Sequence, residues 1–140
     1  GHPRRDMVLV ALAGPGSNLL LAVISAALIH LLPILSGDVY QWAGHNLINS
    51  MRINLLLCVF NMLPMPPLDG GRVAVGLLPN PLSRRLASLE KAGIAIILAA
   101  MFILPWIGGK IGVDLNLFWW LVGIPTEYLL EAVFVITGHG

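Results

Sequence analysis

An isolated carboxylate, Asp69, is the residue best placed to do chemistry. It lies in residues 61–72, which read NMLPMPPLDGGR and follow an apolar stretch directly. The prolines of this segment, beginning with Pro64, lack backbone donors and push the residues before them toward extended geometry, so we expect no helix through residues 64–71. A carboxylate beside freed backbone groups can serve as a metal ligand or a proton acceptor. The alternative is that Asp69 caps a short helix that begins near Gly70.

The cost of an ionisable group at the end of an apolar span constrains the surroundings of Asp69. A charged residue at the centre of a membrane helix costs about 2.5 to 3.5 kcal/mol on insertion scales, and less near the interface. Irregular backbone survives at that depth only when it is buried in protein or lines a watery cavity. The sequence therefore predicts that Asp69 lies in a buried, irregular break.

The other side chains that could bind metal form no recognisable site. Cys58 is the single cysteine, which excludes an internal disulfide and a cysteine zinc site. Glu127 and Glu131 share one helical face and could relay protons or hold a divalent cation, although we favour two solvent-exposed carboxylates. No two of the four histidines have the i to i+4 spacing of a helical ligand pair, and we expect ordinary interfacial, loop or chain-end roles for them: His2, His30, His45 and His139.

The composition indicates a membrane protein. Hydrophobic residues make up 57% of the chain and charged residues only 11%, with a mean hydropathy of +0.85. Soluble domains are usually about 25% charged, so lipid is the natural solvent of this chain. A net charge of +1, from scattered basic residues, excludes the concentrated basic surface that nucleic-acid binding requires.

The apolar stretches predict an all-α, polytopic membrane helix bundle that forms a single transmembrane domain over residues 1–140. We expect about four transmembrane spans, with the Pro/Gly-rich break after the second. Residues 36–46, which include Tyr40 and Trp42, fit an interfacial loop between the first two spans. The four spans are expected over residues 7–35, 47–63, 89–107 and 115–136.

The first span carries a second unusual segment, residues 11–22, which read ALAGPGSNLLLA. Pro15 removes a backbone donor and its glycine neighbours permit close approach, so we expect a kink or a tight helix contact near residues 14–18. Asn18 at membrane depth requires a polar partner.

Positive charge predicts the orientation in the membrane. Arg4 and Arg5 precede the first span, four of the eight basic residues lie in residues 72–91, and residues 36–46 contain none. Basic loops face the cytoplasm, so we expect Asp69 and the 72–91 loop on the cytoplasmic side.

The two unusual segments resemble motifs of one family. Residues 61–72 resemble the N-x-x-P-x-P-x-x-D-G-G signature of the site-2 proteases, which are intramembrane zinc metalloproteases, and residues 11–22 are similar to the A-G-P-x-x-N-x-x-L-A helix of the same family. With the order of the spans, the resemblance covers roughly residues 3–85.

This resemblance implies that Asp69 is the third zinc ligand and that Asn61 lines the active site or holds substrate backbone. Asn61 could equally satisfy carbonyls freed by the proline segment. The resemblance also implies a membrane-protein or peptide substrate, and structural roles for Gly14, Pro15, Asn18, Pro64, Gly70 and Gly71.

The sequence departs from the family at one point, because it contains no H-E-x-x-H. In the family, this helix supplies two histidine ligands and the general-base glutamate, and it precedes the Gly-Pro helix. The chain begins at Gly1 without Met, so we expect a C-terminal portion that is inactive alone. The alternative is a catalytically inactive membrane subunit that binds partner transmembrane helices through Gly14, Gly16 and Ser17.

Overall fold

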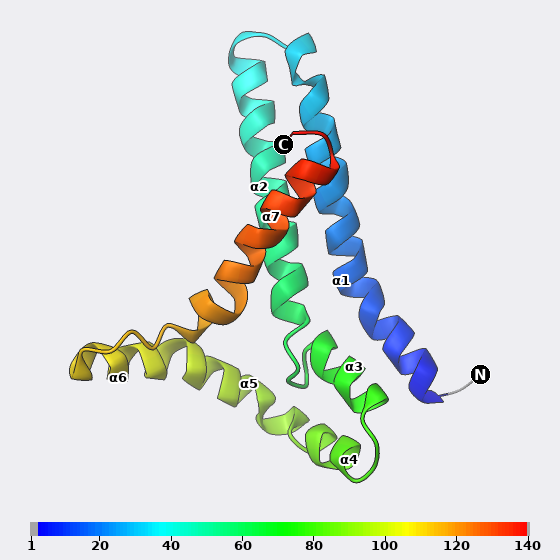
Figure 1. The fold of residues 1–140 in the computed structure, drawn as a ribbon, viewed down its shortest axis with the longest axis vertical. Helices are drawn as coiled ribbons and strands as arrows, with labels where there is room; N and C mark the ends of the chain where they lie inside the picture. The colour runs from blue at the N-terminus through cyan, green and yellow to red at the C-terminus, as the bar shows by residue number, and fades with distance from the viewer. Residues whose placement is uncertain (1–2, 140) are drawn as a thin grey trace.

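The computed structural model describes residues 3–139, and all regular structure within that range is helical, which confirms the all-α prediction (Figure 1). In chain order the elements are α1 (Pro3–Leu28), the 3-10 helix η1 (Ile29–Ile34), α2 (Gly37–Asn61), α3 (Asp69–Leu77), α4 (Leu82–Ala87), α5 (Glu90–Leu98), the π-helix η2 (Ala99–Ile103), α6 (Leu104–Ile111), the π-helix η3 (Trp119–Gly123) and α7 (Ile124–Ile136).

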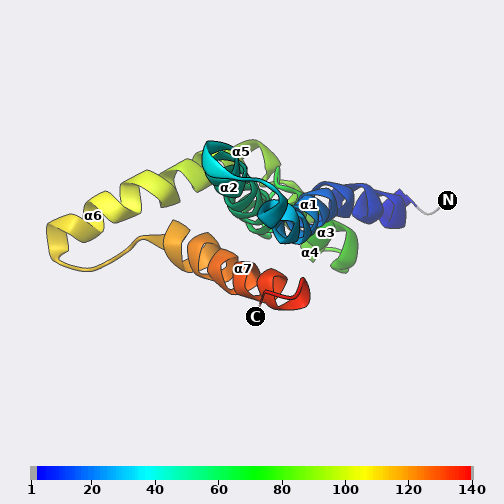
Figure 2. The same cartoon turned by 90° about the horizontal axis from the view of Figure 1, so that it is seen from above.

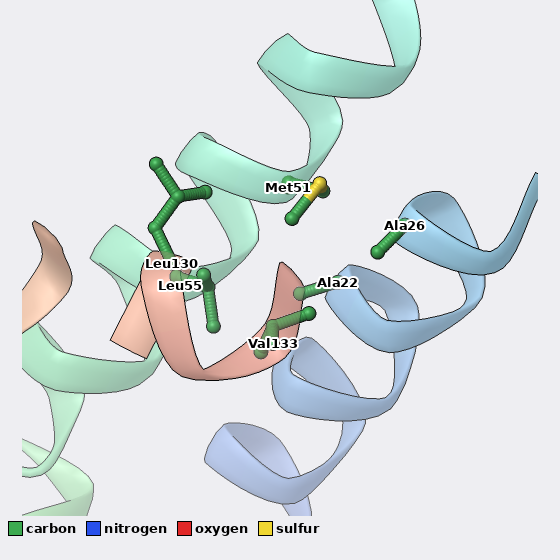
Figure 3. Close-up of a cluster of buried hydrophobic side chains, with 6 residues drawn as sticks. All are labelled: Ala22, Ala26, Met51, Leu55, Leu130 and Val133. Atoms are coloured by element: carbon green, nitrogen blue, oxygen red, sulfur yellow. The ribbon is translucent and has the colours of Figure 1, made fainter. Parts of the chain in front are cut away.

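The scaffold is a bundle of α1, α2 and α7. The first two helices run side by side in opposite directions, and α7 lies across them (Figures 1 and 2). Small residues on α1 allow this close approach. The buried apolar cluster between the three helices consists of Ala22, Ala26, Met51, Leu55, Leu130 and Val133 (Figure 3).

Polar side chains inside the bundle bond to one another or to their own helices. The hydroxyls of Ser25 in α1 and Ser50 in α2 lie 2.8 Å apart. Asn54 donates to the Ser50 carbonyl at 2.8 Å, and the buried Thr126 hydroxyl donates to the Val122 carbonyl at 2.7 Å. These bonds lower the cost of burying polar groups among apolar helices.

The direction of α7 follows from contacts at its two ends. Phe118, just before η3, lies 6.3 Å from Phe60 near the end of α2, measured between ring centroids. At the other end, Nε2 of His139 lies 2.7 Å from the Ala26 carbonyl oxygen. The chain from η3 through α7 therefore runs parallel to α1 and antiparallel to α2.

The segment from α5 through η2 to α6 forms an arm that leaves this bundle. It runs at a steep angle to α1 and α2, and a loop then returns the chain to α7 (Figure 1). We expected the third span to end near residue 107, whereas helix continues through Pro105 and the following glycines to Ile111. Pro105 lies in the first turn of α6, where a missing backbone donor is tolerated.

Three helical segments are long and apolar enough to cross a membrane, within residues 3–139: Pro3–Ile34, Glu90–Ile111 and Trp119–Ile136. They agree with the first, third and fourth spans that we expected. The second is not among them, because only the last turns of α2 are continuously apolar. Our prediction of an interfacial loop over residues 36–46 is also wrong, since α2 begins at Gly37.

The Pro/Gly-rich break after α2 is confirmed, and it is shorter than expected. Residues 62–68 form successive turns, in which the Met65 amide donates to the Leu63 carbonyl at 2.8 Å and the Leu68 amide donates to the Met65 carbonyl at 2.9 Å. Helix resumes at Asp69 rather than after Gly71. The three prolines at positions 64, 66 and 67 account for most of this interruption, because proline lacks a backbone donor and restricts the residue before it.

Candidate functional site

Asp69 is the first residue of α3, and its half-buried side chain is turned toward α1. A Cβ atom placed on Gly14 would lie only 2.9 Å from Oδ2 of Asp69. The two unusual sequence segments therefore meet, and the absence of a side chain at Gly14 is what lets the carboxylate approach the helix. The tight contact that we expected near residues 14–18 is present, and α1 continues as one helix through the buried Pro15.

The capping interpretation of Asp69 is wrong. The residue before α3 that takes the capping position is Leu68, and no side chain caps this helix end. Within residues 3–139 the carboxylate of Asp69 forms neither a side-chain hydrogen bond nor an ion pair. Its oxygens are therefore free to bind a ligand.

Two glycines fix the start of α3 against the break. A Cβ atom on Gly70 would lie 2.1 Å from the Met62 carbonyl oxygen, and one on Gly71 would lie 2.1 Å from the Pro66 nitrogen. Both distances are far shorter than any real Cβ contact, so only glycine fits at either position. The D-G-G sequence thus places the carboxylate by allowing α3 to pack on the backbone of the preceding turns.

The far end of α3 is held by α1 and α4. The Arg4 guanidinium donates to the Val75 carbonyl at 3.0 Å and also to the Leu78 carbonyl. Ser83 donates to the same Val75 carbonyl at 2.6 Å. These bonds satisfy carbonyls that a helix end leaves without partners, and the positive charge suits the negative end of the helix dipole.

Asp69 opens on a cavity of about 550 Å³ at the junction of α1, α3 and α5. Asp6 and Glu90 contribute two further carboxylates to this cavity, and Arg72 contributes a cation. Arg72 lies 3.7 Å from Glu90, and both side chains are about half exposed. Such an exposed pair contributes little to stability. The walls between these charged groups are mostly apolar, from Met7, Val10, Ala11, Pro66 and Val75.

This arrangement does not amount to a complete metal site. Among residues 3–139 no three histidine, cysteine, aspartate or glutamate side chains are close enough to hold a metal ion. Asp69 fits a metal site as one unpaired oxygen ligand, and the remaining ligands would have to come from elsewhere.

Two residues that the sequence singled out stand apart from the cavity. Asn61 ends α2 and is half-buried, yet it does not line the cavity. Asn18 is also half-buried, and the polar partner that we expected for it is not found within residues 3–139.

The histidines lie away from Asp69. His30 and His139 stack on each other with ring centroids 4.0 Å apart, near the end of α1 that is remote from the cavity. His45 is exposed on α2, and His2 lies outside the described residues. Glu127 and Glu131 are both exposed on α7.

Sequence reasoning missed three residues that position α3. Arg4 bonds to backbone carbonyls 71 and 74 residues away, and no local sequence pattern predicts such a contact. Gly76 faces α1, where an added Cβ would lie 2.3 Å from a methyl carbon of Val8. Gly93 of α5 packs on the break, where an added Cβ would lie 1.7 Å from the Pro66 carbonyl oxygen. An isolated glycine within a helical pattern was the available signal for both glycines.

Comparison with known proteins places these motifs in a family. The model of peptidase family M50 matches residues 30–105, more than half of the chain. The Bacillus subtilis protein named "Putative zinc metalloprotease YwhC" is 35% identical over 107 residues, which are 74% of this chain and 48% of that protein. The Methanocaldococcus jannaschii protein named "Putative zinc metalloprotease MJ0611" is 44% identical over 64 residues, which are 46% of this chain and 31% of that protein.

The chain thus spans about half the length, or less, of these curated relatives. No solved structure matches it. The family match covers the break and the start of α3, where the D-G-G glycines pack and Asp69 meets Gly14. The chain belongs to peptidase family M50, the site-2 protease family.

Proposed function

We propose that this chain is part of an intramembrane zinc metallopeptidase that hydrolyses peptide bonds in or near the membrane, and that Asp69 supplies one zinc ligand. The observation that carries this proposal is the free carboxylate of Asp69, which contacts Gly14 and opens on the cavity between α1, α3 and α5. Family membership supports the reaction class.

The other ligands would come from an H-E-x-x-H helix, which this chain does not contain. Two histidines of that helix and Asp69 would hold the zinc ion, which would activate water as the nucleophile. Contacts at both ends of α3 fix its position along α1 and so position the carboxylate. Asp69 packs on Gly14 at one end, and Arg4 bonds to the other. Met7 and Val10 contribute apolar walls to the cavity beside the carboxylate.

In this proposal the missing helix packs against the exposed small-residue face of α1. Nothing lies within 4 Å of a Cβ atom placed on Gly16, and Ser17 is exposed with its hydroxyl bonded to the Ala13 carbonyl. Asn18 on the same helix lacks a polar partner within residues 3–139. A substrate role for Asn61 stays a prediction from the resemblance alone.

The open face of α1 equally suits a second candidate function, a catalytically inactive membrane subunit that binds partner transmembrane helices. The two candidates differ in the coding sequence upstream of Gly1. An in-frame H-E-x-x-H helix there supports the peptidase, and a start codon directly before residue 1 supports the subunit.

For orientation, we propose that Asp69 and the 72–91 loop face the cytoplasm, on the strength of the clustered basic residues. We also propose that α2 crosses the membrane beside α1. Its polar residues near Ser50 are bonded within the bundle, which reduces the cost of placing them in lipid.

Zinc content of the purified full-length protein tests the role of Asp69. We expect Asp69→Asn, which keeps the shape of the side chain and removes its charge, to lose most bound zinc and all measurable peptidase activity. The matched control is Asp6→Asn, a second carboxylate on the same cavity, and it should retain both. Equal zinc in wild type and Asp69→Asn would remove Asp69 from the ligand set, provided that gel filtration shows the same folded species.

A further inference from the structure

A groove of about 380 Å³ lies between the first turns of α1 and the end of α3. It is on a different side of α1 from the Asp69 cavity. One half of its lining consists of arginine guanidinium groups. The other half consists of apolar side chains and one glycine. The lining residues are Arg4, Arg5, Val8, Leu9, Gly76 and Leu77.

The apolar half is open to its surroundings. Leu9 is 56% exposed and Leu77 is 72% exposed. Between them, α1 and α3 are in close contact, because Gly76 has no side chain to hold them apart from Val8. The groove therefore has a closed base and two exposed leucine walls.

The basic half carries uncompensated positive charge. Within residues 3–139 the ion pair that the structure shows joins Arg72 to Glu90, so neither Arg4 nor Arg5 is neutralised by a carboxylate. Arg4 donates to the last carbonyls of α3, which offsets the negative end of that helix dipole. Arg5 is exposed and makes no side-chain hydrogen bond within the same range. Asp6, the nearest carboxylate in sequence, lines the Asp69 cavity instead.

The position of the groove in the bilayer adds a third constraint. Both arginines lie at the start of the Pro3–Ile34 span, where a membrane helix meets the lipid headgroups. Basic pockets between helices at this level bind anionic headgroups, and exposed leucines beside them meet acyl chains.

We propose that this groove binds an anionic phospholipid, with its phosphate against Arg5 and the free donors of Arg4 and one acyl chain along Leu9 and Leu77. A zwitterionic lipid would bring a cation to two arginines and bind less tightly. Free phosphate would leave the leucine walls exposed. The bound lipid would bridge α1 and α3, the two helices whose contact places Asp69.

Native mass spectrometry of the full-length protein in detergent tests this proposal, with phosphatidylglycerol, phosphatidylcholine of the same acyl chains, and glycerol phosphate as probes. We expect retained binding of phosphatidylglycerol alone. Arg5→Gln should weaken that binding about fivefold, the value of one basic residue at a lipid surface, and Leu77→Ser should weaken it further. The fold is preserved in Arg5→Gln, since this side chain makes no bond that the helices need.

The matched control is Arg85→Gln, which removes the same charge from the exposed surface of α4 outside the groove. It should bind phosphatidylglycerol as wild type does. The proposal is overturned if Arg85→Gln and Arg5→Gln weaken binding equally, if phosphatidylcholine binds as tightly as phosphatidylglycerol, or if glycerol phosphate competes at equal concentration.

Discussion

At the scale of single residues, the Asp69 carboxylate is placed by what its neighbours lack. Gly14 leaves space for Oδ2, and Gly70 and Gly71 let α3 start directly on the backbone of residues 62–66. None of these glycines has a positive φ angle. Glycine is required at these three positions for steric reasons, since any side chain would meet a neighbouring atom.

Gly14→Ala tests this steric argument. The added Cβ would stand 2.9 Å from Oδ2 of Asp69, so the carboxylate must move by a fraction of an ångström or more. Displacement of a catalytic group on this scale can cost about 100-fold in rate. On the proposed function, we expect peptidase activity of the full-length protein to fall about 10- to 100-fold and zinc affinity to fall with it.

Gly109→Ala is the matched control for that experiment. It makes the same substitution in α6, where an added Cβ meets nothing within 4 Å in this chain. Alanine is a better helix former than glycine at both positions, so neither change destabilises its helix through the backbone. Equal loss of zinc affinity in both variants would show that Gly14 has no special relation to Asp69.

At the scale of elements, the arm of α5, η2 and α6 makes a close backbone contact with the break after α2. Gly93 in α5 packs on the carbonyl of Pro66, where an added Cβ would lie only 1.7 Å from the oxygen. The break is therefore packed by α3 on one side and by α5 on the other, and Pro66 between them is buried.

Gly93→Ala should loosen this attachment. We expect the free energy of unfolding to fall by about 1 to 3 kcal/mol, the usual cost of forcing an extra carbon into a packed contact. Gly109→Ala in α6, where an added Cβ meets nothing within 4 Å, should raise stability by about 0.5 to 1 kcal/mol through helix propensity. Thermal unfolding in detergent measures both. A stabilising Gly93→Ala would contradict the packing that the structure shows.

The sequence predicted helices, apolar spans and the break because each leaves a local pattern. Three of four spans and the interruption after Asn61 follow from hydropathy and from proline chemistry. The sequence-based prediction failed over residues 36–46, where polar residues suggested a loop. There Asp38 lies in the first turn of α2, where an acidic side chain favours a helix start.

The candidate site was predictable only in part. The carboxylate and its glycines were marked by their motif, whereas the contact between Gly14 and Asp69 joins residues far apart in the chain. The positioning role of Arg4 depends on carbonyls more than 70 residues away. Such pairings are set by how α3 packs on α1, and no periodicity within either helix specifies them.

At the scale of the whole molecule, the direction of α7 decides at which end of the helix bundle residue 136 lies. Four alternating spans would return residue 136 to the side of Asp69. In the structure α7 instead runs parallel to α1, and His139 lies beside Ala26. The end of α7 is therefore on the side of the turn between η1 and α2.

Cysteine labelling in intact cells or sealed vesicles tests this arrangement. In a Cys58→Ala background, we expect Ser36→Cys and Ile136→Cys to react with a membrane-impermeant thiol reagent from the same side. Ser88→Cys should react from the opposite, cytoplasmic side. Labelling of Ile136→Cys together with Ser88→Cys would contradict the parallel course of α1 and α7, and labelling of Ser88→Cys from outside would contradict the orientation.

The packing of α3 on α1 also has a consequence for biosynthesis. The partners of α3 on this surface, Arg4, Val8 and Gly14, all precede it in the chain, by as many as 74 residues in the case of Arg4. Because synthesis proceeds from the N-terminus at about 5 to 20 residues per second, α1 is complete before Asp69 leaves the ribosome. The carboxylate can then take its place on α1 while the chain is still nascent, and Gly93 packs on Pro66 only later.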